Sequence, residues 1–152
     1  MEVQKDLNNV RFRYFRPLYM PDEALHKTLE ESLIKHADTV QYLQIYWKPI
    51  TKNLSRLVNL MSLNIDLSYC DYEDLKSLDW SQLESLSFPV LKILKTQRVP
   101  SKSLASLIEN AGGHLTEISV DDYGYDDYIS KTYPSNLSKL SKPYICQTMF
   151  RE

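Results

Sequence analysis

Glycine, cysteine and long apolar runs are all scarce in this 152-residue chain. Its 3 glycines supply neither a phosphate-cradling loop nor a glycine-rich linker between domains. Its 2 cysteines, Cys70 and Cys146, fit neither a disulfide framework nor a zinc site, which favours a reducing compartment, cytoplasmic or nuclear. No stretch approaches the roughly 18 apolar residues of a membrane span, so we expect no membrane partner.

A strong net charge of either sign is also missing. The 18 basic and 20 acidic side chains leave a formal charge of -2, which excludes a global field that would attract nucleic acid. Arg11, Arg13 and Arg16 stand among aromatic residues, but no further basic cluster follows them. We interpret them as a solvated strand face and expect no nucleic-acid partner. The 43% hydrophobic content is enough for the core of one domain.

Catalytic and metal-binding patterns are absent as well. The histidines at positions 26, 36 and 114 are isolated in sequence, and we expect structural or solvated roles for them. The acidic segment 121–127 contains Gly124 but misses the calcium-loop spacing and its closing glutamate. We therefore predict no catalytic residues, no metal and no cofactor, and hence no enzyme. A metal-binding or hydrolytic protein built on the acidic segment is an alternative.

What the chain does contain is a repeated spacing, in which an apolar residue is followed at +3 and +5 by two more. Such residues share one face of a short strand, while their neighbours point to the other face. Repetition at intervals of roughly twenty to thirty residues is typical of a leucine-rich-repeat solenoid. The clear copies are Val40, Leu43 and Ile45; Leu60, Leu63 and Ile65; Leu83, Leu86 and Phe88; and Leu115, Ile118 and Val120, with Leu91, Leu94 and Thr96 as a degenerate copy.

The copies that begin at Leu83 and Leu91 compete with each other. The eight residues between them are too few for a parallel crossover, which needs a dozen or more. We favour residues 90–97 as the strand, because Pro89 suits the position before it and Pro100-Ser101 can begin a helix.

Helical spacing fills the intervals between these strands. In the helix expected over 22–37, Leu25, Leu29 and Leu33 form a buried stripe, while Glu23, Lys27, Glu30 and Glu31 lie in water. Leu54, Leu57 and Val58 form a second stripe, and residues 72–78 a third helix. In the last helix Ser101 or Ser103 is the N-cap, and Gly112-Gly113 follows, where the chain takes a positive φ.

The predicted fold class is α/β, a short leucine-rich-repeat solenoid with a curved parallel sheet and helices on its convex side. Residues 1–21 form an N-terminal extension, residues 22–122 an arc of about four strand-helix units, and residues 123–152 a weakly ordered tail. Because a solenoid has two open ends, we expect either that another chain covers one end or that the repeats continue.

The residues between the buried positions form the exposed, concave face of the predicted sheet. Tyrosines beside hydrogen-bonding groups suit protein recognition, although a polar sheet face can also serve solubility alone. We expect Tyr46, Asp66, Gln97 and Asp121 to align as one row. The candidate protein-binding residues are Tyr42, Gln44, Tyr46, Asn64, Asp66, Lys95, Gln97, Ser119 and Asp121.

Segments 40–45, 91–97 and 107–118 resemble the repeats of a large fungal family of F-box and leucine-rich-repeat proteins. The similarity covers roughly residues 20–125, the repeat portion only, and no F-box is recognisable. In that family the F-box docks on the Skp1 adaptor of a cullin ubiquitin ligase and the repeats hold the substrate. The resemblance implies a Skp1-type adaptor as a partner only if an F-box lies outside this chain.

We therefore predict a protein-recognition module with a protein partner of unknown identity. A substrate-binding repeat region related to F-box adaptors is one form of it. The alternative is a structural or oligomerisation module with no link to a ligase.

Overall fold

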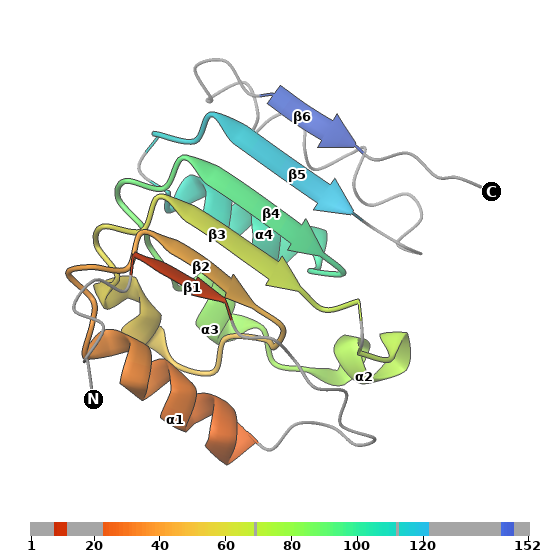
Figure 1. The fold of residues 1–152 in the computed structure, drawn as a ribbon. Coiled ribbons are helices and arrows are strands. Elements are labelled where there is room, and N and C mark those ends of the chain that lie inside the picture. The colour runs from red at the N-terminus through yellow and green to blue at the C-terminus, as the bar shows by residue number, and fades with distance from the viewer. Residues whose placement is uncertain (1–7, 12–22, 69, 112, 122–143, 148–152) are drawn as a thin grey trace.

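A computed structural model of the chain describes residues 8–11, 23–68, 70–111, 113–121 and 144–147. These residues form one sheet whose six strands lie side by side in chain order, all parallel (Figure 1). The strands are β1 (Asn9–Arg11), β2 (Tyr42–Ile45), β3 (Ser62–Asp66), β4 (Ile93–Gln97), β5 (Glu117–Asp121) and β6 (Tyr144–Gln147). Of these, β1 lies within the predicted N-terminal extension and β6 within the predicted tail.

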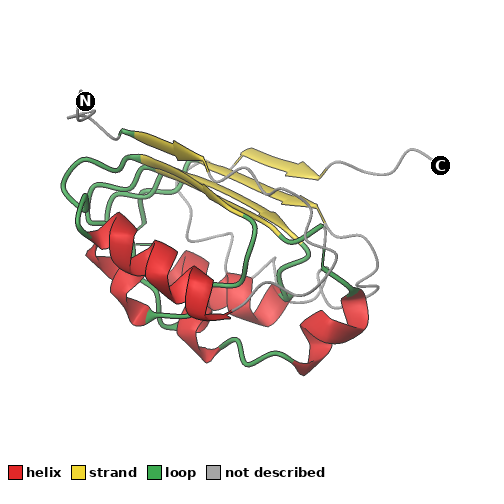
Figure 2. Cartoon of the chain, turned by 60° about the horizontal axis from the view of Figure 1, so that its bottom comes forward, coloured by secondary structure: helices red, strands yellow, loops and turns green. Residues whose placement is uncertain are grey.

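The helices make a second layer under one face of the sheet, as Figure 2 shows. This arrangement confirms the predicted α/β class. No helix in the described part of the chain is long and apolar enough to cross a membrane. The helices are α1 (Glu23–Ile34), the 3-10 helix η1 (Lys52–Arg56), α2 (Tyr72–Ser77), α3 (Ser81–Glu84) and α4 (Ser101–Glu109).

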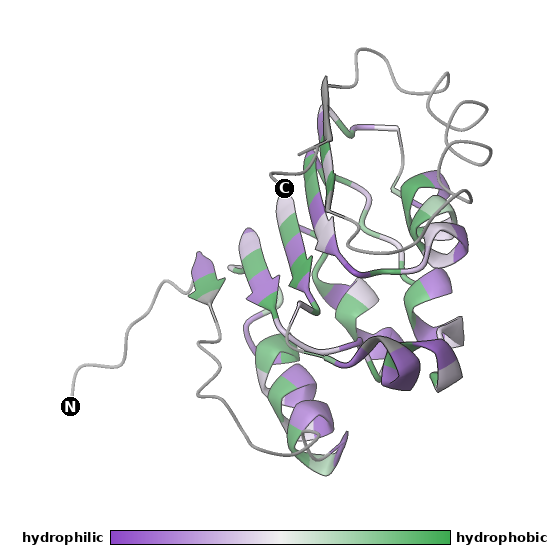
Figure 3. Cartoon of the chain, turned by 90° about the vertical axis from the view of Figure 1, so that its right-hand side faces the viewer, coloured by the Kyte–Doolittle hydropathy of each residue, from purple (hydrophilic) through white to green (hydrophobic). Residues whose placement is uncertain are grey.

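The repeated spacing identifies the core correctly. Its +3 residues are in register across the central strands, where Leu43 pairs with Leu63 and Leu63 with Leu94. Side chains alternate between the two faces of a strand, and Figure 3 shows this as bands of opposite hydropathy. All of the predicted inward residues are buried: Val40, Leu43, Ile45, Leu60, Leu63, Ile65, Leu91, Leu94, Thr96, Leu115, Ile118 and Val120.

The competition between the two close copies is resolved as the sequence predicts. Ile93–Gln97 is the strand, and the copy at 83–88 begins within the short helix α3 and continues into the loop after it. Leu83, Leu86 and Phe88 are still fully buried. Apolar spacing therefore indicated burial at both places, the crossover length excluded two strands, and the proline signals selected the second copy.

The predicted orientation of α1 is confirmed for Leu33, and Leu29 packs partly buried against the core, but the prediction is wrong for Leu25 and Glu30. Leu25 is 55% exposed, and the buried side chains are His26, Glu30 and Leu33. The cause is the segment 47–51, which follows β2 and packs against the helix. Its donors satisfy the Glu30 carboxylate, and Trp47 stacks on His26 with ring centroids 4.8 Å apart. A helix face with two polar residues can therefore be buried, because its polar atoms find partners there.

Two further local predictions need correction. Leu54 and Leu57 are buried as expected, but Val58 is 46% exposed because η1 is a 3-10 helix that ends at Arg56. The N-cap of α4 is Pro100, which makes no side-chain capping bond. Ser103 is instead buried inside the helix, where its hydroxyl donates a 2.9 Å hydrogen bond to Glu84 Oε1.

The predicted positive φ after α4 is confirmed at Gly113, whose φ is +80°. Gly112 lies outside the described residues. A second residue with positive φ, Arg98 at +59°, follows β4 directly and carries no glycine signal in the sequence.

Candidate protein-binding surface

The outer face of the sheet, opposite the helices, carries the residues that the sequence nominates for binding. Gln44, Asn64, Lys95 and Ser119 are Cα partners across four neighbouring strands. They form a continuous polar row, because side chains at paired positions of a sheet project to the same face. Tyr42 heads the next row and is 41% exposed.

Of the four residues predicted to align as one row, Asp66, Gln97 and Asp121 occupy paired positions on neighbouring strands. Asp66 pairs with Gln97, and Gln97 pairs with Asp121. Tyr46 comes after β2 has ended at Ile45, so it is not part of the paired ladder. It is half-buried and lies between the buried residues Ile45 and Trp47, which continues the alternation of the strand.

Two contacts constrain this surface. Lys95 Nζ lies 3.4 Å from Glu117 Oε1, a diagonal ion pair between β4 and β5 with both side chains well exposed. Such a pair is worth at most about 1 kcal/mol, so a partner can displace it at little cost. Asp66 Oδ1 accepts hydrogen bonds from the backbone and the hydroxyl of Ser68, at 3.0 and 2.6 Å. One Asp66 oxygen therefore supports the turn after β3.

The register extends both outer rows beyond the strands that the sequence analysis considered. Asn9 pairs with Tyr42 and Arg11 with Gln44, so β1 adds its positions to these rows at one edge. At the other edge of the sheet, Tyr144 of β6 is the Cα partner of Glu117. The sequence signal for β1 was the strand face assigned to Arg11, Arg13 and Arg16.

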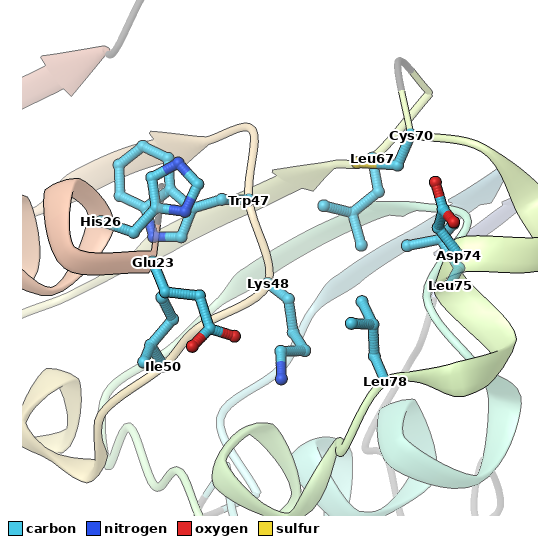
Figure 4. A pocket seen from close by; sticks show the side chains of 10 residues that line it. All are labelled: Glu23, His26, Trp47, Lys48, Ile50, Leu67, Cys70, Asp74, Leu75 and Leu78. Atoms are coloured by element: carbon cyan, nitrogen blue, oxygen red, sulfur yellow. The ribbon is translucent and has the colours of Figure 1, made fainter. Parts of the chain in front are cut away.

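A pocket at the carboxyl ends of the strands was missed by the sequence analysis. It encloses about 60 Å³ between the start of α1, the segment after β2, the turn after β3 and α2. Figure 4 shows Leu67 and Leu78 pointing toward each other across it, with Lys48 beside them. The residues that line it come from four separate segments, which explains why no sequence pattern predicts the pocket.

The residues considered for chemistry do not converge. His26 is buried against Trp47, whereas His36 and His114 are exposed. Among the residues that the structure describes, no three His, Cys, Asp or Glu side chains are placed to hold a metal ion. The acidic segment lies outside the described residues from position 122 onward.

Comparisons of the chain with family models, with curated proteins and with solved structures find no match. The function must therefore be inferred from the sheet face and the pocket themselves.

Proposed function

We propose that the chain is a leucine-rich-repeat module that recognises another protein through the outer face of its sheet. One observation carries the proposal: the sheet is all-parallel, its strands follow in chain order, and the described helices cover a single face (Figures 1 and 2). All-parallel sheets usually have helices on both faces. A parallel sheet with one open face is typical of solenoids, which use that surface for binding.

The packing of the units supports a repeat architecture. The inward rows continue from strand to strand, with Ile45 beside Ile65 and Thr96 beside Val120. A single strand-helix unit cannot exclude water from its own leucines, so the units must stack to gain the roughly 1.5 to 3 kcal/mol per buried leucine. Curvature of the sheet, with the helices on the convex side, is part of this proposal.

The chemistry of the outer face favours a protein as the partner. Tyr42 offers aromatic area that loses little entropy when it is buried. The polar row beside it offers amide, ammonium and hydroxyl groups at the regular spacing of neighbouring strands. The only ion pair described on this face joins Lys95 to Glu117, so charges of both signs are available to a partner.

The identity of the partner stays open in this proposal. The resemblance of segments 40–45, 91–97 and 107–118 to the repeats of fungal F-box proteins supports a substrate-binding role in a cullin ubiquitin ligase. A Skp1-type adaptor would join only through an F-box outside this chain. We assign the chain no catalytic role, no cofactor and no nucleic-acid or membrane partner, and we propose a cytoplasmic or nuclear location.

The test is quantitative capture of partners with a matched pair of variants. Tyr42→Ser alters the outer face, and Val58→Ser alters the helical side at a residue of similar exposure, 41% against 46%. We expect Tyr42→Ser to reduce recovery of bound proteins at least fivefold, as hot-spot truncations do. Val58→Ser should leave recovery unchanged. Equal recovery with all three proteins would refute binding through the sheet face.

The alternative, a structural or oligomerisation module, gives a different result in the same experiment. The captured protein would then be the chain itself, and light scattering would give a mass above 17.8 kDa for the purified protein.

A further inference from the structure

The pocket at the carboxyl ends of the strands has a mainly apolar wall. Leu67 after β3, Leu75 and Leu78 from the region of α2, and Ile50 after β2 all line it. Leu67 and Leu75 have almost no exposed surface and form its closed base, whereas Ile50 and Leu78 are half-buried. Half-buried apolar side chains of this kind can bind an aliphatic or aromatic group, because water is then excluded from both surfaces.

Two carboxylates stand on opposite sides of this wall, as Figure 4 shows for Glu23 and Asp74. Within the described part of the chain, neither carboxylate accepts a hydrogen bond. The single cation of the lining, Lys48, donates a hydrogen bond to the backbone oxygen of Asp79. Its charge also helps hold the pKa of the Asp79 carboxyl low, after the larger effects of the backbone and hydroxyl of Ser81.

Charged groups surround the Cys70 thiol on the side of the pocket near Asp74. Burial raises the pKa of the Cys70 thiol, which lines the pocket there. Arg98 opposes this rise, whereas Asp74, Asp66 and Asp71 add to it. Of these charged groups, Asp74 is the one whose carboxylate lines the pocket itself.

We propose that this pocket receives an arginine or lysine side chain of a protein partner, with its aliphatic part against Leu78, over the closed base of Leu67 and Leu75, and its cationic head beside Asp74. The apolar wall matches the methylene chain and the carboxylates match the charge, as in other sites where long basic side chains pack along apolar surface. Glu23 contributes less, because Lys48 stands between it and the leucines (Figure 4).

This proposal rests on the proposed function in one respect: the cation is assumed to belong to a protein partner. The pocket lies at the end of the strands, so the same partner could contact the sheet face and the pocket together. A short linkage between two such contacts raises affinity without strengthening either one.

The first arm of the test uses small probes of the pocket itself. n-Butylguanidinium, n-butylammonium, n-butanol and butyrate are titrated into the isotope-labelled protein, and binding is followed at the Trp47 indole N–H, since Trp47 lines the pocket. We expect both cations to bind at least fivefold more tightly than butyrate and n-butanol. Equal affinity for all four, or no change at Trp47 with either cation, would overturn the proposal.

Charge variants give the second readout. Asp74→Asn should weaken n-butylguanidinium binding about fivefold, and Glu23→Gln should weaken it less. Asp38→Asn removes an exposed carboxylate that does not line the pocket, and it should not change the binding of n-butylguanidinium. Circular dichroism confirms that each variant is folded. An Asp74→Asn effect no larger than that of Asp38→Asn would contradict the assignment of the cation site.

The third arm identifies the source of the cation. A glycine-serine heptapeptide with a central arginine is compared with the same peptide carrying neutral citrulline. Tighter binding of the arginine peptide supports a protein source. If n-butylguanidinium binds and the arginine peptide does not, the ligand is a free small organic cation, and a protein source is refuted. Partner capture that still depends on Tyr42 would leave the proposed function intact while the pocket proposal fails.

Discussion

The indole N–H of Trp47 donates a 3.1 Å hydrogen bond to Oε1 of Glu30, across 17 residues of sequence. The same oxygen accepts from the Ile50 backbone at 2.8 Å, and Oε2 accepts from the backbone and the hydroxyl of Thr51 at 2.8 and 2.7 Å. One buried carboxylate of α1 thus holds the segment that follows β2. That segment also supplies Trp47 and Ile50 to the pocket.

Glu30→Leu should destabilise the protein strongly. The variant leaves four buried or half-buried donors without an acceptor, and each can cost about 1 to 3 kcal/mol. We expect a loss of about 3 kcal/mol in the free energy of unfolding, measured by urea denaturation. Glu31→Leu, at an exposed neighbouring position, should stay within about 0.5 kcal/mol. Similar stability of the two variants would show that the Glu30 network is not structural.

Replacing the two serines at the start of α4 should have unequal effects on stability, although the sequence analysis treats both as possible N-caps. Ser101 makes no capping bond in the structure, because Pro100 is the N-cap. Ser101→Ala should therefore change the free energy of unfolding by less than about 0.5 kcal/mol. Ser103→Ala removes the bond to Glu84 and should cost about 1 kcal/mol. The reverse order would restore Ser101 as a capping residue.

Arg98 combines a positive φ of +59° with a 2.7 Å hydrogen bond from its Nη1 to the Cys70 backbone oxygen. Arg98→Ala loses that bond and keeps an unfavourable backbone conformation. Arg98→Gly loses the same bond, but glycine adopts positive φ without a steric penalty. Thermal or urea unfolding should therefore find the glycine variant about 1 kcal/mol more stable than the alanine variant. Equal stability would mean that the backbone at this position relaxes.

Alkylation of Cys70 provides a test based on pH. Burial raises the pKa of this thiol, so less thiolate is present near pH 8 than in the unfolded chain, and iodoacetamide should react more slowly with the folded protein. The Cys146→Ser variant leaves Cys70 as the single thiol, because the chain has 2 cysteines.

In that background, Asp74→Asn removes a charge that raises the pKa and should speed the reaction. Arg98→Ala removes the opposing charge and should slow it. Mass spectrometry of the alkylated fraction across pH 7 to 10 separates these effects from general access to the thiol. Slower reaction of Asp74→Asn would contradict the electrostatic description of the pocket.

The apolar spacing in the sequence was sufficient to predict which strand residues are buried, because strand periodicity is a local property. Leu43, Leu63 and Leu94 follow from it, and the polar row between them follows from the same alternation. The eight-residue interval before Leu91 also showed that the two close copies cannot both be strands, and the prolines at 89 and 100 favoured the second copy. These conclusions depend only on backbone geometry and chain length, which the sequence contains directly.

The orientation of α1 could not be predicted from apolar spacing in the same way. A leucine stripe on α1 favoured burial of Leu25, yet Glu30 is buried and Leu25 is exposed. The free energy of burying a carboxylate depends on whether donors reach it, and those donors come from residues 47–51. The pocket between Glu23 and Asp74 depends likewise on segments that are distant in sequence.

By itself, the sequence determined the α/β class, the approximate places of the four strands that the structure has at 42–45, 62–66, 93–97 and 117–121, and which of their side chains face the core. Only the tertiary structure decided the burial of Glu30, the positive φ of Arg98 and the pocket below the strand ends. The physical reason is that alternation along a strand is set by neighbouring residues. Hydrogen-bond satisfaction and cavity shape are set by groups that meet only after the chain has folded.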